Sequence, residues 1–142
     1  MVQAAPIDTP LIKLGGVALN VTDLPRSERF YTQIIGLAVA IRVPPDGPTK
    51  EIALCVSGSL TGGDPFLVLA NLGEPVAPGR ESFGRVIVNT TDAQAMAHRA
   101  TAAGYVAEAL SPPGADRPVY FLTDPDGYHV ELYQASAAEA KY

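Results

Sequence analysis

The chain contains one short pattern twice, and this repeat constrains its fold more than any other feature. Residues 15–23 read Gly-Gly-Val-Ala-Leu-Asn-Val-Thr-Asp, and residues 83–92 read Phe-Gly-Arg-Val-Ile-Val-Asn-Thr-Thr-Asp. Val17 corresponds to Val86 and Asp23 corresponds to Asp92, so one constant offset relates the copies. Each copy alternates as a strand does and then reaches a polar turn that can begin a helix. The repeat therefore predicts a duplicated folding unit.

Both copies continue with the same order of elements. The first helix is expected over Ser27–Ile35 with Gly36 as its stop, and the second over 93–103, capped by Asp92 and stopped by Gly104. Three strand-like runs follow each helix, separated by loops rich in proline and glycine. The runs are Leu37–Val43, Lys50–Val56 and Pro65–Leu72 in the first copy, and Tyr105–Leu110, Pro118–Thr123 and Tyr128–Gln134 in the second. The sequence thus predicts strand, helix and three strands, twice over.

Length and composition indicate a single folded domain. The chain has 142 residues, 47% of them hydrophobic, and its mean hydropathy is +0.14. These values exclude a disordered chain and predict one domain over residues 1–142 with a single core. Within it we expect a first module at about 11–72, a second module at about 83–134, and flexible ends at 1–10 and 135–142.

Charge and terminal sequence limit the partners. The formal net charge is −5, and no basic stripe can neutralise phosphates, so neither nucleic acid nor an anionic membrane is expected as a partner. No apolar run is long enough to cross a bilayer, and residues 1–6 lack the pattern of a secretory signal, so a cytoplasmic protein is expected. The single cysteine, Cys55, lies in an apolar run and is predicted to be a buried thiol.

Three segments resemble the vicinal oxygen chelate superfamily, which includes glyoxalase I, extradiol dioxygenases and bleomycin-resistance proteins. They are Val17–Leu24, the stretch from Phe30-Tyr31 to Ile35-Gly36-Leu37, and Asp124-Pro125-Asp126-Gly127 leading to Glu131-Leu132. The resemblance covers about residues 11–134. It implies an α+β fold of two βαβββ modules, whose curved mixed sheets surround a cup-shaped cavity that holds the ligand. A fold of this kind does not by itself assign a chemistry.

Alternation along the strands predicts which side chains face this cavity. Val17, Leu19 and Val21 form the face of the first strand that packs beneath a helix, so its neighbours lie on the other face. The same rule on the fifth and last strands places polar side chains on the cavity floor. The predicted set is Asn20, Arg85, Asn89, His129, Glu131 and Tyr133. A few polar groups among aliphatic walls are typical of a small-molecule pocket.

A few aromatic and charged residues outside this set are further candidates for the site or for the core. Tyr120 and Arg42 are further candidates for contact with a ligand, whereas Phe66 and Phe121 are expected to belong to the core. His129 is a candidate acid–base group, although a histidine at a strand end is more often a rim residue.

The resemblance also predicts where a metal ion would bind. Metal-dependent relatives place ligands at the starts of the first and fifth strands and a glutamate on the last strand. Glu131 matches the last position, but the first two are Gly16 and Arg85, and a further position on the fourth strand falls near Val68. Glycine has no donor, and the arginine side chain does not lose its proton. One carboxylate does not hold a divalent ion, so no metal and no cofactor are expected.

Glu131 is instead expected to pair with Arg85. In one interpretation the two charges only neutralise each other. In the other, Arg85 anchors an anionic or carbonyl-bearing ligand and Glu131 acts as a hydrogen-bond acceptor or base. An arginine beside a carboxylate favours its ionised form, which makes it a weaker base.

Three functions are consistent with these residues. The first is a metal-free ligand-binding protein of the bleomycin-resistance type, a homodimer that holds a small organic drug or metabolite with Arg85 as anchor. The second is a metal-independent lyase, isomerase or hydrolytic enzyme that uses Glu131, with His129 or Arg85, as acid–base group. The third is a metal-dependent glyoxalase I or ring-cleaving dioxygenase, against which Gly16 and Arg85 argue. Pairing of Glu131 favours the first.

Overall fold

The computed structural model describes residues 15–73, 76 and 85–139. The predicted flexible segment 1–10 and the first residues of both predicted modules lie outside the described residues. At the other end, the described residues 135–139 include a buried Ala135 and a turn in which the backbone N–H of Ser136 donates to Glu139. Flexibility of 135–142 stays a prediction.

The order of the elements repeats as the sequence predicts. The first module contains β1 (Gly16–Asn20), α1 (Leu24–Arg29), the π-helical η1 (Phe30–Ile34), β2 (Ala38–Val43), β3 (Glu51–Cys55) and β4 (Phe66–Ala70). The second contains β5 (Val86–Thr90), α2 (Ala93–Ala102), β6 (Ala107–Ala109), β7 (Val119–Thr123) and β8 (His129–Gln134). Every predicted strand-like run therefore contains a strand, shortened by a few residues at its ends.

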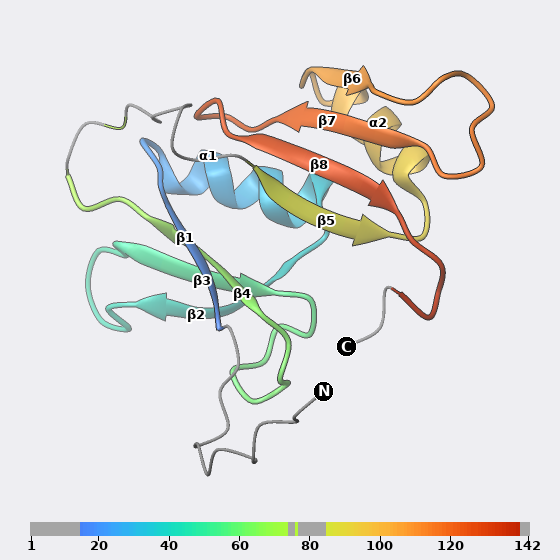
Figure 1. Cartoon of the computed structure of the whole chain (residues 1–142). Coiled ribbons are helices and arrows are strands. Elements are labelled where there is room, and N and C mark those ends of the chain that lie inside the picture. Colours follow the sequence, from blue (N-terminus) through green and yellow to red (C-terminus); the bar gives the residue numbers. More distant parts are fainter. Residues whose placement is uncertain (1–14, 74–75, 77–84, 140–142) are drawn as a thin grey trace, which may run out of the picture.

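Each module forms one four-stranded mixed sheet (Figure 1). The first sheet has the order β1-β4-β3-β2 and the second has the order β5-β8-β7-β6. The first strand of each module pairs in parallel with the last strand, and the other pairs are antiparallel. The predicted α+β class with two duplicated modules is confirmed, whereas the cup-shaped cavity surrounded by the sheets stays a prediction.

The helices begin at side-chain caps. Asp92 accepts a hydrogen bond from the backbone N–H of Ala95, as predicted for α2. The first helix begins earlier than predicted, at Leu24, because Asp23 accepts from the backbone N–H of Arg26 and thereby caps the first turn. Among the described residues, no helix is long and apolar enough to cross a membrane.

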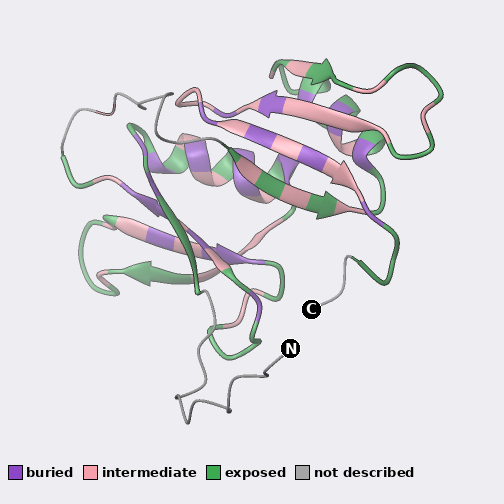
Figure 2. Cartoon of the chain, viewed as in Figure 1, coloured by how far each residue is buried: buried purple, intermediate pink, exposed green. Residues whose placement is uncertain are grey.

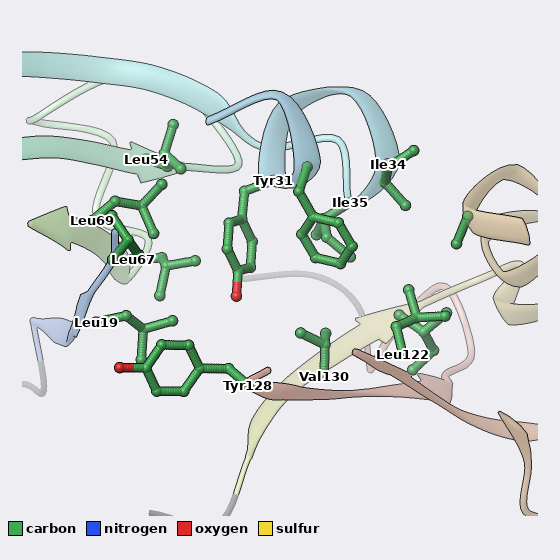
Figure 3. Close-up of a cluster of buried hydrophobic side chains, with 14 of the residues drawn as sticks. Leu19, Tyr31, Ile34, Ile35, Leu54, Leu67, Leu69, Leu122, Tyr128 and Val130 are labelled. Carbon is green, nitrogen blue, oxygen red and sulfur yellow. The ribbon is translucent and has the colours of Figure 1, made fainter. Parts of the chain in front are cut away.

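One buried core joins the two modules (Figure 3). Tyr31 of η1 lies between Leu69 of the first sheet and Val130 of the second, and Phe30 belongs to the same buried cluster. Both sheets turn one face towards this core, so alternate strand residues are buried (Figure 2). The opposite face of each sheet is called its open face below. Cys55 is a buried free thiol, as predicted.

Candidate functional site

Arg85 and Glu131 meet on the open face of the second sheet. The parallel ladder pairs Val86 with Val130 and Ile87 with Glu131, which brings the residue just before β5 beside the middle of β8. Arg85 Nε donates a hydrogen bond to Glu131 Oε2, so the predicted pair is present. The arginine side chain is 44% exposed and the glutamate side chain 15%. The guanidinium therefore covers the carboxylate and remains accessible itself.

Phe121 lies under this ion pair, which overturns its assignment to the core. It is the register partner of Glu131 across β7 and β8, and directly opposite residues of antiparallel strands share a face. The Arg85 guanidinium carbon lies 5.6 Å from the centre of the phenyl ring, within the range of a cation–π contact. The sequence neighbours of Phe121, Tyr120 and Leu122, are also apolar, so this strand shows no alternation from which the face of Phe121 could be predicted.

His129 completes a row of three stacked groups. Its ring is stacked with Phe121, with centroids 5.9 Å apart and planes 27° apart. His129 Nδ1 is buried and has no hydrogen-bond partner among the described residues. No carboxylate or carbonyl of the described chain therefore makes a hydrogen bond to this nitrogen.

Tyr133 and Asn89 lie further along the same face. They are register partners in the parallel ladder of β5 and β8, and the Tyr133 hydroxyl accepts a 3.4 Å hydrogen bond from Arg117. Arg117 also donates to Glu139 at 3.0 Å, and this hydrogen bond raises the pKa of Arg117 above its usual value. Five of the predicted residues thus share one face: Arg85, Asn89, His129, Glu131 and Tyr133.

Three other predicted residues lie elsewhere. Tyr120 is the register partner of Leu132 and packs against the core. Asn20 ends β1 in the first sheet, where its backbone carbonyl accepts from the Tyr128 hydroxyl at 2.9 Å. Arg42 lies on β2 and makes two hydrogen bonds to Glu28, which lower the pKa of that carboxyl. The structure does not bring these three to the Arg85–Glu131 pair.

The open face of the first sheet carries an apolar pocket of about 310 Å³. No lining residue is charged. The lining residues are Gly15, Gly16, Val17, Ala18, Ala53, Leu60, Phe66 and Val68. Val17, which was expected to pack beneath a helix, is instead 43% exposed. Phe66, like Phe121, was expected in the core but lies on an open face, and again its neighbours Leu67 and Val68 are apolar and hide the alternation.

A larger and more polar groove of about 620 Å³ lies at one end of the first sheet, along Thr22–Pro25, Lys50 and Asn71. Its polar groups are partly engaged with one another, since the Asn71 amide donates to the carbonyl of Thr22 at 3.0 Å. It contains none of the predicted site residues, and neither hollow includes a residue of the second sheet.

Comparison with known proteins identifies the family. The sequence profile of the glyoxalase/bleomycin resistance protein/dioxygenase superfamily matches residues 13–132. The chain belongs to this superfamily. A curated relative, the "probable lactoylglutathione lyase" of Vibrio cholerae serotype O1, is 27% identical over 124 residues, which are 86% of this chain and 90% of the relative.

Solved structures of the superfamily share the fold. The trypanothione-dependent glyoxalase I of Leishmania major matches with a TM-score of 0.68 at 23% identity, over 87% of this chain and 86% of that one. TnmS3, an antibiotic-binding protein from Streptomyces sp. CB03234, matches with a TM-score of 0.67 at 21% identity, over 90% of this chain and 99% of that one. The superfamily thus includes an enzyme and a binding protein, so membership does not by itself assign a chemistry to this chain.

The residues at the positions where the resemblance implies metal ligands do not fit a divalent ion. A side chain cannot be added at Gly16, because a Cβ atom there would lie 1.9 Å from the carbonyl oxygen of Phe66. Arg85 brings a positive charge to the position of a second ligand, and its ion pair with Glu131 uses the carboxylate that a metal ion would need. Within the described part of the chain, no three His, Cys, Asp or Glu side chains gather where they could hold a metal ion.

Proposed function

We propose that this superfamily member binds a small organic ligand on the open face of its second sheet without a metal ion, with Arg85 as the anchor. The observation that carries the proposal is the Arg85–Glu131 pair. Its guanidinium is fixed by Glu131 through Nε and by Phe121 beneath it, while 44% of the side chain stays exposed. A guanidinium held in this way offers its remaining N–H groups in a fixed direction.

Binding is favoured over proton abstraction by the state of the two candidate bases. Glu131 Oε2 already accepts a hydrogen bond from Arg85 Nε, so this oxygen is engaged before any ligand arrives. His129 is packed against Phe121, with Nδ1 buried and without a partner among the described groups. The antibiotic-binding relative TnmS3 supports the same choice at the level of the superfamily.

The alternative is a metal-independent lyase or isomerase in which Glu131 is the acid–base group. The curated relative named as a probable lactoylglutathione lyase supports an enzymatic function of this kind. Glu131→Gln separates the two functions. An enzyme loses turnover of a bound compound while its affinity survives, whereas a binding protein never converts its ligand in either form.

We also propose that a second copy of the chain completes the site. The apolar pocket and the Arg85–Glu131 pair lie on different sheets, and each open face faces away from the shared core. In a homodimer that sets the first sheet of one copy against the second sheet of the other, the pocket would cover the ion pair. Light scattering during size-exclusion chromatography tests this: a mass of one chain of 14.9 kDa at micromolar concentration contradicts it.

The anchor is tested by a ligand screen on matched arginine variants. Compounds that bind the wild-type protein in calorimetry should lose at least about tenfold in affinity to Arg85→Ala. Arg42→Ala is the control, because Arg42 is also half exposed and paired with a glutamate, but on the other sheet. Equal losses in both variants, or no loss at Arg85→Ala, would reject Arg85 as the anchor.

A further inference from the structure

We infer that the ligand at the Arg85–Glu131 pair is an electrically neutral aromatic compound that carries a carbonyl oxygen beside an N–H or O–H group, such as an aromatic amide or hydroxy-ketone. This inference rests on the proposed function and narrows it, since an anchor made of arginine alone would equally accept an anion. The groups that surround the Arg85 guanidinium select a neutral ligand over an anion.

The pair presents a donor and an acceptor next to each other. Arg85 uses Nε for Glu131 Oε2, and its two terminal nitrogens make no hydrogen bond to the described residues. Glu131 Oε1 likewise accepts no hydrogen bond from the described residues. A carbonyl oxygen can therefore accept from the guanidinium while a neighbouring N–H or O–H of the same ligand donates to the carboxylate.

The pair has no surplus positive charge for an anion. Glu131 cancels the charge of Arg85, and the next arginine on this face, Arg117, is paired with Glu139. A carboxylate at Arg85 would either displace Glu131 or lie within a few ångströms of it, and like charges at that distance cost affinity. A neutral ligand adds hydrogen bonds to both partners and breaks none.

The flanks of the pair are apolar. Ile87 is the register partner of Glu131 in the parallel ladder and is 59% exposed. On the inner side, Arg85 rests on the ring of Phe121. An aromatic ring in the ligand can stack on the outer side of the guanidinium and cover Ile87, which removes apolar surface from water. These contacts favour a flat aromatic ligand over a sugar or a small polar metabolite.

The test compares compounds of one shape on the full-length protein. The probes are 2-naphthamide, which is neutral with donor and acceptor, 2-naphthoate, which is anionic, and N,N-dimethyl-2-naphthamide, which lacks the donor. Calorimetry or ligand-observed NMR at pH 7 should show 2-naphthamide binding about tenfold or more tightly than either other compound. Its affinity should change little between low and high salt, because no net charge is neutralised.

Two glutamate variants test whether the negative charge of Glu131 is what disfavours an anionic ligand. Glu131→Gln removes the negative charge but keeps an amide oxygen, so 2-naphthoate should gain about tenfold in affinity while 2-naphthamide changes by less than about threefold. Glu28→Gln, which alters the other arginine–glutamate pair, should change neither affinity. A thermal melt of each variant confirms that it is folded.

Each other outcome overturns the inference. If 2-naphthoate binds the wild-type protein as tightly as 2-naphthamide, the ion pair does not select against anions. If neither binds at millimolar concentration, the pair is not a site for neutral aromatic amides. In both cases the proposed function stands or falls separately, on whether hits from the ligand screen depend on Arg85.

Discussion

The Tyr31 hydroxyl donates a 2.8 Å hydrogen bond to Asp124 Oδ2, and this contact joins η1 to the turn that precedes β8 (Figure 3 shows Tyr31 pointing towards β8). The other oxygen of Asp124 accepts from the backbone N–H groups of Asp126 and Tyr128, at 2.9 and 2.8 Å. Burial raises the pKa of Asp124 and that of Tyr31. Because β8 carries Glu131, this contact between modules also positions the candidate site.

Tyr31→Phe should reduce the free energy of unfolding by about 1–3 kcal/mol at pH 7, because it leaves a buried carboxylate oxygen without its donor. The loss should be smaller at pH 4. The Tyr31 hydrogen bond lowers the pKa of Asp124, so its removal raises that pKa further. A raised folded-state pKa costs stability as pH rises through it. Urea unfolding at both pH values measures the difference.

Tyr105→Phe is the matched control, because Tyr105 also packs on Phe30 but its hydroxyl makes no hydrogen bond to the described residues. It should change stability by less than about 0.5 kcal/mol. A Tyr31→Phe loss that is no larger than the control, or that grows towards pH 4, contradicts the role given to Asp124.

Asp126 makes a second contact between the modules. Its Oδ1 accepts from the backbone N–H of Thr22 at 3.1 Å and from the Thr22 hydroxyl at 2.5 Å, and its Oδ2 accepts from the Ser27 hydroxyl at 3.3 Å. Thr22→Val should cost about 1–2 kcal/mol, and a double-mutant cycle with Asp126→Ala should give a coupling energy of at least about 0.5 kcal/mol. Thermal or urea unfolding measures both values.

Thr101→Val serves as control for the loss of a threonine hydroxyl, because Thr101 is exposed and bonds only carbonyls of its own helix. We expect its effect to stay within about 0.5 kcal/mol. Additive losses at Thr22 and Asp126 would mean that the two residues do not act together.

The sequence predicted the elements and the central pair well, for a physical reason. Two strands that alternate in the same way at a constant offset belong to equivalent modules, so parity placed Arg85 and Glu131 on one face. Their pairing was predicted from the resemblance, which gives both residues positions of ligands to one metal ion. Parity failed where a strand is apolar throughout. Phe66 and Phe121 lie in such runs, and only the register with a partner strand shows that each lies on an open face.

The role of Asp124 and Asp126 could not be read from the sequence either. The pattern Asp-Pro-Asp-Gly indicates a turn, and the hydrogen bonds of Asp124 within that turn are local. The partners of Asp126, Thr22 and Ser27, lie about 100 positions earlier, at sequence separations of 104 and 99. Only the packing of the two modules brings them together.

Asp64 closes the loop that carries Leu60 to the edge of the apolar pocket. It accepts from the backbone N–H of Ser57 at 2.9 Å and from the Ser57 hydroxyl at 2.7 Å. These hydrogen bonds, that of the backbone N–H above all, lower the pKa of Asp64 to about 2. A lowered folded-state pKa gives stability that is complete above the unfolded value of 3.8 and is lost as pH falls towards 2.

Asp64→Asn should therefore be less stable than the wild-type protein at pH 5, and the gap should close as pH falls from about 4 to about 2. Thermal melts across this range measure the gap. Asp116→Asn, at an exposed loop position, is the control for the substitution itself and should stay within about 0.5 kcal/mol of the wild-type protein at pH 5. A difference between the wild-type protein and Asp64→Asn that is constant from pH 5 to pH 2 would show that the charge of Asp64 is not what holds the loop.

Gly16 should tolerate no side chain, and this bears directly on metal chemistry. A Cβ atom there would meet the carbonyl oxygen of Phe66 at 1.9 Å, and the φ angle of +154° is one that other residues rarely adopt. Gly16→Ala should therefore cost about 3 kcal/mol or more, or prevent folding, because β1 and β4 would have to separate. Gly15→Ala is the matched control, since a Cβ at Gly15 meets nothing within 4 Å. It should stay within about 1 kcal/mol of the wild-type protein.

For the same reason a histidine placed at position 16 should not restore a metal ligand, and zinc or nickel titration of any folded Gly16→His protein should show no stoichiometric binding. Equal stability of the Gly16→Ala and Gly15→Ala proteins would mean that β1 and β4 do not pack as closely as the ladder requires.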